Sequence, residues 1–437
     1  MSKFAILFLL TYASGLIASL SLYGAWGFYI YEIVYFLNPD QRWWSANIPA
    51  ISYSFFTVVF MCMALLLHGE DHRNNRLLDA PQVPWMLLLL AIYGITSFYA
   101  VDPLVHQQSL TQLVKMFIVM GLAYKLIDSP QKLQHAFWAY LAGATYIGME
   151  ARRVGRDWQG RVEGIGTVDA PDANGIAAAI APATIFLILF FWRGNFWSRL
   201  AAIFMGAWIV NALILINSRG SFLAVVAGAG YFTMMMIFSK LQQGKQRIAA
   251  VLIVIVGLSG AIYQTDDVFW GRMETLSNIQ DESKSGSHRY RMWLSTFDLV
   301  ADYPQGVGAN GYNVLSERYV DAALFAKRQT QKAVHSSWFQ ALAEVGWLGL
   351  LVYIGLVVSC FRLTAKLKRK FFLSKDVHNY FQTLAIEAAL ITFLVAGTFI
   401  DRFRAEIFYW LVMFIACAGN IYLFKKHQTH SKAEDAT

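Results

Sequence analysis

Charge is scarce in this sequence. Only 15% of its 437 residues are Asp, Glu, Lys or Arg, whereas 57% are hydrophobic and the mean hydropathy is +0.43. A soluble domain is about one quarter charged and about half apolar, so this composition excludes an ordinary soluble domain. Apolar runs recur along the whole chain, and a run of about 17 to 20 residues can cross a bilayer as a helix. The sequence therefore predicts an all-α polytopic membrane protein.

Cysteine is also rare. Cys62, Cys360 and Cys417 lie in apolar runs without metal-type spacing, which predicts packing residues rather than a disulfide framework or a zinc site. The segments expected to face outward contain no D-x-D acidic cluster. We therefore expect no metal and no cofactor. The first apolar run lacks a clear small-residue cleavage site, so no cleaved signal peptide is expected either.

The excess positive charge, +8 overall, falls between the apolar runs. It is better explained as topology-setting charge than as a nucleic-acid surface, because short cytoplasmic loops of membrane proteins are rich in Lys and Arg. Three basic segments, 239–247, 364–375 and 425–432, are therefore predicted to be cytoplasmic. The outer segments then include 149–172, 217–219, 264–346 and 400–406. In a diderm bacterium the outer side is the periplasm and the membrane is the inner membrane.

We expect spans near 49–67, 85–99, 109–126, 134–148, 173–191, 200–216, 220–238, 248–263, 347–363, 380–399 and 407–424. The segment 4–37 is too long for one straight span and short for two. The predicted count is twelve or thirteen, and twelve would leave both termini in the cytoplasm.

Four parts of the chain follow from this pattern: spans over 1–263, a large outer loop over 264–346, further spans over 347–424 and a cytoplasmic tail over 425–437. The loop is predicted to form a small helical subdomain, because Trp293, Phe297 and Val300 recur at helical spacing before the helix-breaking Pro304.

Polar side chains gather at the outer side. They are Lys115, Arg161, Arg219, Arg289, His335, Glu344 and Asp401. Ionisable residues in or beside spans are costly and tend to mark sites. Each also has an ordinary explanation: an interfacial anchor for an arginine, a snorkelling lysine, a capping or packing histidine. Arg289 lies on the Trp293 face of its helix, whereas Arg291 points elsewhere. Glu344 is expected on one continuous helix with His335, holding a polar junction rather than catalysing.

As a group, several cations with one histidine suit a substrate that carries a diphosphate near the bilayer surface. Guanidinium groups bind phosphate oxygens bidentately and stabilise a departing diphosphate. An imidazole can take the proton from an attacking hydroxyl.

Three ordered motifs resemble the bacterial O-antigen ligase and O-antigen polymerase superfamily. They are "SRGSFLAVVAG" at 218–228, "YPQGVGANGY" at 303–312 and "HSSWFQALAEVGWLGL" at 335–350. The last matches a histidine-headed element through His335, Ser336, Phe339, Leu342, Glu344, Gly346 and Gly349. Ser336 stands where Asn is frequent, and we expect it to keep the helix-cap chemistry. "PDANGIAAAIAP" at 171–182 and "RMETL" at 272–276 resemble the O-glycosylation ligase branch.

The resemblance implies a GT-C-type membrane glycosyltransferase whose donor is a glycan on undecaprenyl diphosphate. It implies that Arg219, Arg289 and His335 are catalytic, and that Arg219, Arg289, Lys115 and Arg161 hold the diphosphate. Asp401, added on position alone, and Glu344 are supporting residues. The favoured partner is a lipid A–core acceptor, in an inverting, metal-independent reaction without nucleic acid. Two rivals share the motifs: an O-antigen polymerase and a protein O-oligosaccharyltransferase. A lipid-linked glycan transporter is disfavoured, because its charges would lie near mid-bilayer.

Overall fold

The computed structural model describes residues 2–69, 72, 75–158, 160–242, 244–274, 285–325 and 331–424. The predicted cytoplasmic tail lies outside these residues, as do 275–284 and 326–330 of the predicted outer loop. The described residues fold into helices, with no β-strand among them.

The helices follow one another with short connections. They are α1 (Lys3–Ser21), α2 (Ala25–Leu37), α3 (Tyr53–Leu67), α4 (Val83–Thr96), α5 (Pro103–Leu126), α6 (Pro130–Val154), α7 (Ala173–Ile180), α8 (Ala183–Arg193), α9 (Phe196–Ile216), α10 (Arg219–Phe238), α11 (Gly244–Tyr263), α12 (Asp267–Glu274), α13 (Ser285–Asp302), α14 (Gly311–Tyr319), α15 (Ser337–Leu373), α16 (Val377–Gly397) and α17 (Glu406–Gly419). Short 3-10 turns lie at Pro39–Gln41, Ser45–Asn47, Leu77–Asp79 and Ala322–Leu324, and a π turn, Asn420–Phe424, follows α17.

Nine helical segments in the described part of the chain are long and apolar enough to cross a membrane, and α3 and α4 are shorter apolar helices. The multi-pass membrane character predicted from composition is thus supported. The break between α7 and α8 falls at Ala181 and Pro182 inside one predicted span. Proline has no N–H to continue the helical ladder, which accounts for the interruption there.

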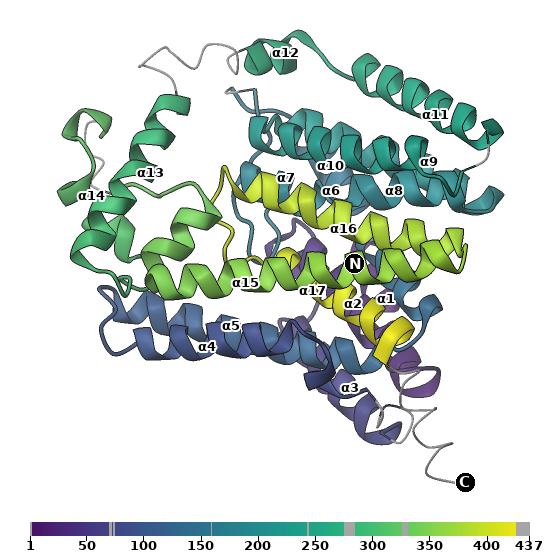
Figure 1. Cartoon of the computed structure of the whole chain (residues 1–437), viewed down its shortest axis with the longest axis horizontal. Helices are drawn as coiled ribbons and strands as arrows, with labels where there is room; N and C mark the ends of the chain where they lie inside the picture. The colour runs from purple at the N-terminus through teal and green to yellow at the C-terminus, as the bar shows by residue number, and fades with distance from the viewer. Residues whose placement is uncertain are drawn as a thin grey trace.

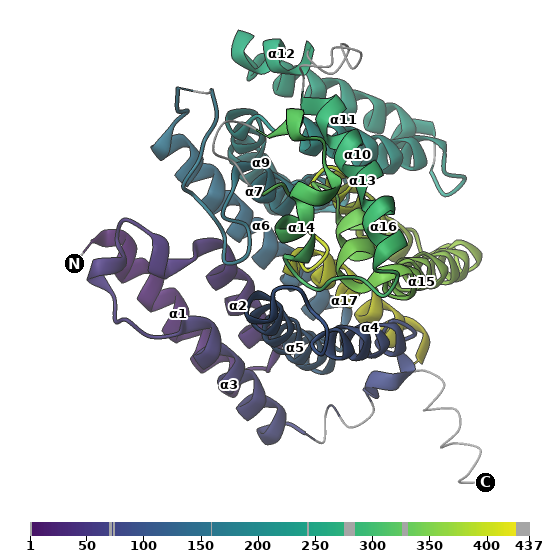
Figure 2. The same cartoon turned by 90° about the vertical axis from the view of Figure 1, so that its left-hand side faces the viewer.

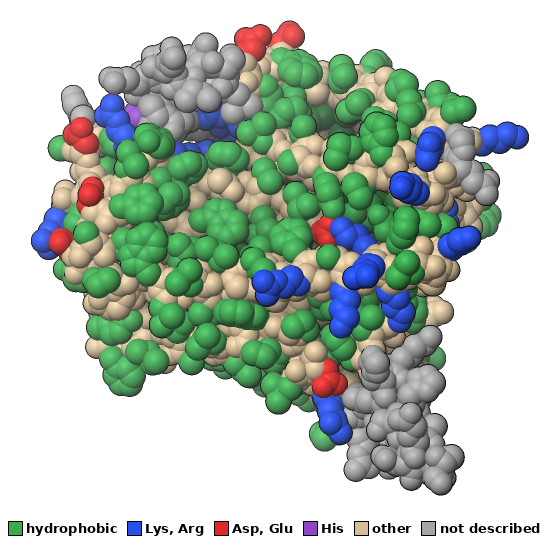
Figure 3. Space-filling view, viewed as in Figure 1, with side chains coloured by type: hydrophobic (Ala, Val, Ile, Leu, Met, Phe, Trp, Pro, Cys, Tyr) green, Lys and Arg blue, Asp and Glu red, His purple; other side chains and the backbone are tan. Residues whose placement is uncertain are grey.

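The long helices run side by side, with α13 and α14 together at one end of the molecule (Figure 1). We call this end the loop end. Viewed from it, α13 and α14 lie over the middle of the bundle, with α1 and α3 at the lower left and α12 at the top (Figure 2). Basic side chains gather toward the end opposite α13 and α14, and a broad hydrophobic surface lies between the two ends (Figure 3). Such a distribution is expected of a membrane protein whose basic end faces the cytoplasm.

The ambiguous segment 4–37 forms two helices rather than one broken span. Phe4, at the start of α1, packs edge-on against Trp43, which follows α2, with ring centroids 5.5 Å apart. The chain after α2 is tied to the loop end, because Arg42 donates to the Gly166 carbonyl over 3.1 Å. At the far end, α17 finishes beside α15, where Tyr422 packs on Phe371. The start of α1 and the end of α17 therefore pack against different parts of the bundle.

The helix α15 is interrupted at Gly346, where φ is 65° and ψ is −168°. The break leaves the carbonyls of Ala343 and Glu344 without helical partners. The 303–309 segment supplies them: Val307 N–H donates to Ala343 over 2.8 Å and Gly308 N–H donates to Glu344 over 2.9 Å. The glycine-rich segment predicted only to end a helix thus also completes the backbone hydrogen bonds of α15.

The segment from α13 to α15 has an apolar core of its own. Trp293 of α13 stacks on Phe339 of α15, with ring centroids 5.5 Å apart and an interplanar angle of 12°. Buried residues of this core include Met292, Leu299, Val300, Val307, Tyr312, Val320, Leu324, Val334, Leu342 and Ala343. The predicted Trp293 face therefore packs against the start of α15, and this contact fixes where Arg289 emerges.

Candidate active site

His335 has a left-handed backbone, with φ 57°. A non-glycine residue in this region costs about 1–3 kcal/mol and persists only where the surroundings hold it. Here Asp401 holds it: its Oδ1 accepts the Ser336 N–H over 2.9 Å. His335 therefore lies before α15, not on one continuous helix with Glu344 as expected. Because of this left-handed backbone, the direction of the imidazole is not set by the geometry of α15.

Ser336 is the N-cap residue of α15, but its side chain does not cap the helix. Its Oγ is buried without a hydrogen-bond partner among the described residues. The expectation that Ser336 preserves the cap chemistry is therefore wrong. The Asp401 carboxylate, contributed by the segment between α16 and α17, accepts the Ser336 N–H at this buried helix end instead.

The same segment ties down the next residues of α15. The Ser337 hydroxyl donates to the Ile400 carbonyl over 3.0 Å and accepts from the Arg402 N–H over 3.0 Å. Trp338 Nε1 donates to the Thr398 hydroxyl over 3.1 Å. These hydrogen bonds anchor the chain next to His335 from a part of the sequence more than sixty residues away.

The His335 imidazole is held in its neutral form. Burial lowers its pKa to about 4, and the nearby charges of Arg289 and Lys332 act in the same direction, whereas Asp172 opposes them. A neutral imidazole has one nitrogen able to accept a proton. At neutral pH the residue is therefore ready to act as a base.

Arg289 lies one turn before Trp293, on the face of α13 that packs against α15. Burial lowers the pKa of its guanidinium, as do the charges of Arg219 and Arg161, while Asp401 acts the other way. Among the described residues, none is hydrogen-bonded or ion-paired to this guanidinium. Three arginines from distant segments thus lie close enough to repel one another.

Arg161 is fixed to the junction between α9 and α10. Its Nε donates to the Ile216 carbonyl over 3.3 Å, and its Nη2 donates to Asn174 Oδ1 over 2.8 Å. The same Asn174 oxygen accepts from the Ser218 hydroxyl over 3.0 Å. Asn174 therefore joins the arginine of one loop to the residue that precedes Arg219. Sequence reasoning quoted its motif but did not assign it this role.

Arg272 is a further arginine of this group that the sequence analysis did not single out. It lies on the short helix α12, and its pKa is lowered to about 10 by burial and then by the charges of Arg161, Arg219 and Arg289. Its position within "RMETL" gave no signal, because nothing in the sequence says which way α12 faces.

Lys115 and Glu344 lie apart from this arginine group. Lys115 is exposed on α5, which begins at Pro103 rather than near 109, so the residue lies deeper along the helix than expected. Glu344 is buried and forms an ion pair with Arg404 over 3.1 Å, and it accepts from the Tyr93 hydroxyl over 2.7 Å. Its contacts are those of a residue that joins helices.

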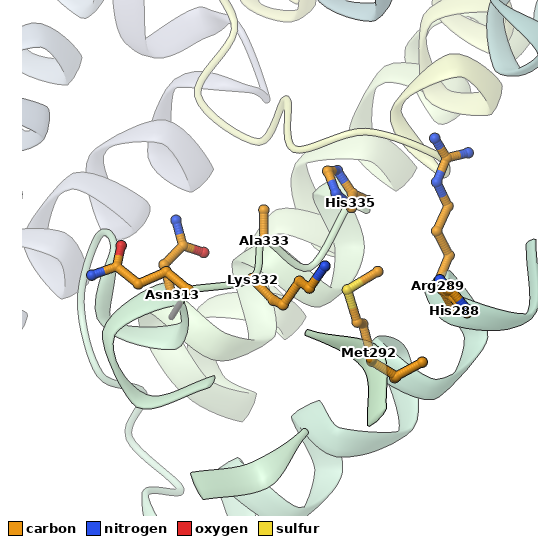
Figure 4. A pocket seen from close by; sticks show the side chains of 9 residues that line it. His288, Arg289, Met292, Asn313, Lys332, Ala333 and His335 are labelled. Atoms are coloured by element: carbon orange, nitrogen blue, oxygen red, sulfur yellow. The ribbon is translucent and has the colours of Figure 1, made fainter. Parts of the chain in front are cut away.

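A cavity of about 420 Å³ opens beside His335. Figure 4 shows Asn313 at the left and Arg289 at the right of the view, with Lys332 and Met292 toward the centre and His335 above them. The remaining lining residues are His288, Leu324, Gln331 and Ala333. Amide, imidazole and ammonium groups in the lining suit a hydroxyl-bearing ligand. Within the described ranges, no group of three or more His, Cys, Asp or Glu side chains is arranged to hold a metal ion.

Comparison with known proteins gives one family match. Residues 204–354 match the Wzy_C family model, described as O-antigen ligase. A search of curated proteins finds no match. The matched segment contains Arg219, Arg272, Arg289 and His335. For this segment the match confirms the resemblance to the O-antigen ligase superfamily that the sequence motifs predict.

Proposed function

We propose that this protein is a glycosyltransferase of the O-antigen ligase type. It transfers a glycan from undecaprenyl diphosphate to a sugar hydroxyl of lipid A–core, at the periplasmic face of the inner membrane, with a GT-C-type architecture. One observation carries the proposal: Arg289 lines the cavity beside His335 and lies near Arg219, and all three residues fall within the segment that matches the family.

The donor's diphosphate binds to Arg219, Arg289 and Arg161. These guanidiniums offset the two negative charges of the diphosphate diester and the further charge that develops on its leaving oxygen. The polyprenyl tail remains in the surrounding lipid. Arg289 suits this role because it is half-buried with no carboxylate bound to it among the described residues.

The acceptor hydroxyl approaches from the cavity beside His335. Its oxygen attacks the anomeric carbon, and the neutral imidazole takes the hydroxyl proton. The bond between the anomeric carbon and the diphosphate oxygen breaks, and the electron pair leaves with undecaprenyl diphosphate. Attack opposite the leaving group inverts the anomeric configuration. No energy source beyond the donor bond is needed.

Reconstitution of the full chain tests the proposal. The purified protein is incubated with a polyprenyl-diphosphate-linked glycan and lipid A–core, and the glycosylated product is measured. Loss of a positioned base lowers the rate of a reaction about 10²–10⁴-fold. His335→Ala should therefore reduce the rate of transfer by a factor in that range. The rate of transfer by Arg289→Ala should also fall sharply. Arg291→Ala is the matched control, because Arg291 is more exposed and faces Asp321 at 4.0 Å.

Wild-type transfer by correctly inserted His335→Ala or Arg289→Ala would contradict the assignment. Parallel reactions with a second lipid-linked glycan, or with an exported protein rich in Ser and Thr, separate the ligase from its two enzyme rivals. If the glycan is transferred only to the second lipid-linked glycan or only to the exported protein, the proposed donor chemistry stands and the proposed lipid A–core acceptor is wrong.

A further inference from the structure

The short helix α12 is docked beside the arginine group by apolar contacts. Phe269 and Met273 of α12 are buried against Ile214 of α9, in a cluster that also includes Val210 and Phe222. The Phe269 and Phe222 rings meet edge-on, with centroids 5.6 Å apart. Since Phe222 lies one turn into α10, these contacts fix α12 next to Arg219 at the start of that helix.

Polar contacts hold the opposite edge of α12. Asn217, at the junction of α9 and α10, donates from Nδ2 to the Val268 carbonyl over 3.3 Å. Asp266, which precedes the helix, forms an ion pair with Arg156 and caps α12 by accepting the Phe269 N–H over 2.9 Å. Gly160 lies so close to Val268 that a Cβ there would stand 2.7 Å from the valine Cγ1. The helix is thus fixed to two segments that carry Arg161 and Arg219.

This docking determines where Arg272 points. Residues four apart lie on one face of a helix, so Arg272 follows Val268 by one turn on the side whose valine side chain faces Gly160. The electrostatic environment agrees, because the charges of Arg161, Arg219 and Arg289 all act on Arg272. Four arginines from four separate segments therefore lie near enough for their charges to interact.

Two carboxylates act on this group within the part of the chain that the structure describes. Glu163 lies 3.8 Å from Arg161, and Asp401 acts on Arg289. A diphosphate that binds among these guanidiniums lowers the repulsion between their like charges. We propose that Arg272 is a fourth diphosphate-binding residue of the donor site, an inference that rests on the proposed glycan transfer.

The position of α12 suits a lipid-anchored diphosphate. It directly follows the exposed apolar helix α11 (Figure 1), and Trp270 on its outer side is 42% exposed. Tryptophan is enriched where bilayer and water meet. A phosphate group at that depth, with its tail in the lipid beside α11, lies within reach of the α12 face that carries Arg272.

The chemistry gives Arg272 a role distinct from simple attraction. The donor diphosphate is a diester with two negative charges, and it leaves as a monoester with additional charge when its bond to the anomeric carbon breaks. A fourth cation therefore binds the leaving group more strongly than the donor. Arg272 should contribute more to kcat than to the donor KM.

The test measures binding and turnover with the full chain in detergent. Binding of undecaprenyl diphosphate is followed for wild type, Arg272→Ala, Arg272→Lys and the control Arg291→Ala. Charged hydrogen bonds contribute about 1.5–3 kcal/mol, which corresponds to about a tenfold to hundredfold loss of affinity for Arg272→Ala. Arg272→Lys should recover part of the affinity, because it keeps the charge without the planar fork. Arg156→Ala removes the ion pair with Asp266 that helps to hold α12 in place. Its affinity for undecaprenyl diphosphate shows how much binding is lost when α12 is displaced while Arg272 is retained.

Inorganic diphosphate and phosphatidylglycerol vesicles are each tested as competitors for the binding of undecaprenyl diphosphate. Competition by diphosphate but not by phosphatidylglycerol supports the inference. Wild-type affinity and turnover in Arg272→Ala, with Arg219→Ala and Arg289→Ala impaired, would overturn it while leaving the proposed function intact. Preferential binding of phosphatidylglycerol at Arg272 would also overturn it. Failure of wild type itself to bind any polyprenyl diphosphate would instead reject the proposed function.

Discussion

Glu344 and Arg404 form an ion pair of 3.1 Å inside the loop end, where the Glu344 side chain is only 5% exposed. The pair joins α15, just before its break at Gly346, to the segment that carries Asp401. Tyr93 donates to the same carboxylate, and Arg404 also donates to the Ser109 hydroxyl over 2.6 Å. One buried network therefore connects α4, α5 and α15 behind the candidate site.

Glu344→Ala should destabilise the protein strongly. It leaves the Arg404 guanidinium in a buried site without its carboxylate, and breaking a buried pair in this way costs about 3–5 kcal/mol. Thermal unfolding in detergent measures the change. The exposed pair of Arg318 and Asp302, 3.3 Å apart, provides the comparison, because loss of such a pair costs about 0–1 kcal/mol. Equal effects of Glu344→Ala and Asp302→Ala would contradict a structural role for the buried pair.

Gly346→Ala should impair folding even though it adds one methyl group. At φ 65° a side chain is strained, and its Cβ would overlap the backbone at Pro304 and Gln305. Gly257 in α11 is the matched control, because a Cβ there meets nothing within 4 Å. Gly257→Ala should be neutral or stabilising by up to about 1 kcal/mol. Yield of folded protein after membrane extraction measures both, and a well-folded Gly346→Ala protein would argue against a rigid break.

Much of the architecture follows from the sequence because apolar runs and basic loops report directly on membrane crossing. The expected spans near 200–216, 220–238 and 248–263 agree with α9, α10 and α11 to within a few residues. The start of α5 was misjudged, since His106 and other polar residues in its first turns hide the helix from hydropathy. His106 is buried, and its Nδ1 accepts from the Ala309 N–H over 3.1 Å.

The candidate site was predictable from the sequence only in part, because contacts between distant segments leave no local pattern in the sequence. Motifs predict Arg219, Arg289 and His335 as candidate site residues, but long-range contacts decide what holds each of them. Asp401 lies 65 residues from Ser336 in the chain, and no local pattern reveals that its carboxylate replaces the serine cap. Likewise, the direction of Arg272 depends on how α12 docks against α9 and α10.

Asp401→Ala should lower transfer more than it lowers folded yield. Loss of an N-cap acceptor costs about 0.5–2 kcal/mol, and it also frees the left-handed backbone of His335. Asp401→Asn retains an oxygen that can accept the Ser336 N–H, so it should keep most of the activity lost in Asp401→Ala. Initial rates at saturating donor, alongside thermal unfolding, measure the two effects. Equal losses in the two variants would show that the negative charge, rather than the cap, is what matters.

The pH dependence of transfer should reflect the unusual environment of His335. A base with a pKa of about 4 stays neutral across the physiological range, so kcat/KM should be flat near neutrality and fall only in acid. Bound donor brings negative charge to the imidazole and raises its pKa. The acid limb of kcat should therefore lie at higher pH than that of kcat/KM, since the two profiles report the bound and the free enzyme.

The stability of the protein should change with pH in the corresponding direction. The unfolded chain has a histidine pKa of about 6.5, whereas folding lowers that of His335 to about 4. Between these values the unfolded state binds more protons, so stability from this residue rises with pH through the window and is constant above it. His335→Gln removes the titration and should flatten both this stability change and the acid limb of any residual transfer. An acid limb of kcat/KM that stays near pH 6.5 in wild type, or persists in His335→Gln, would show that a different group controls the reaction.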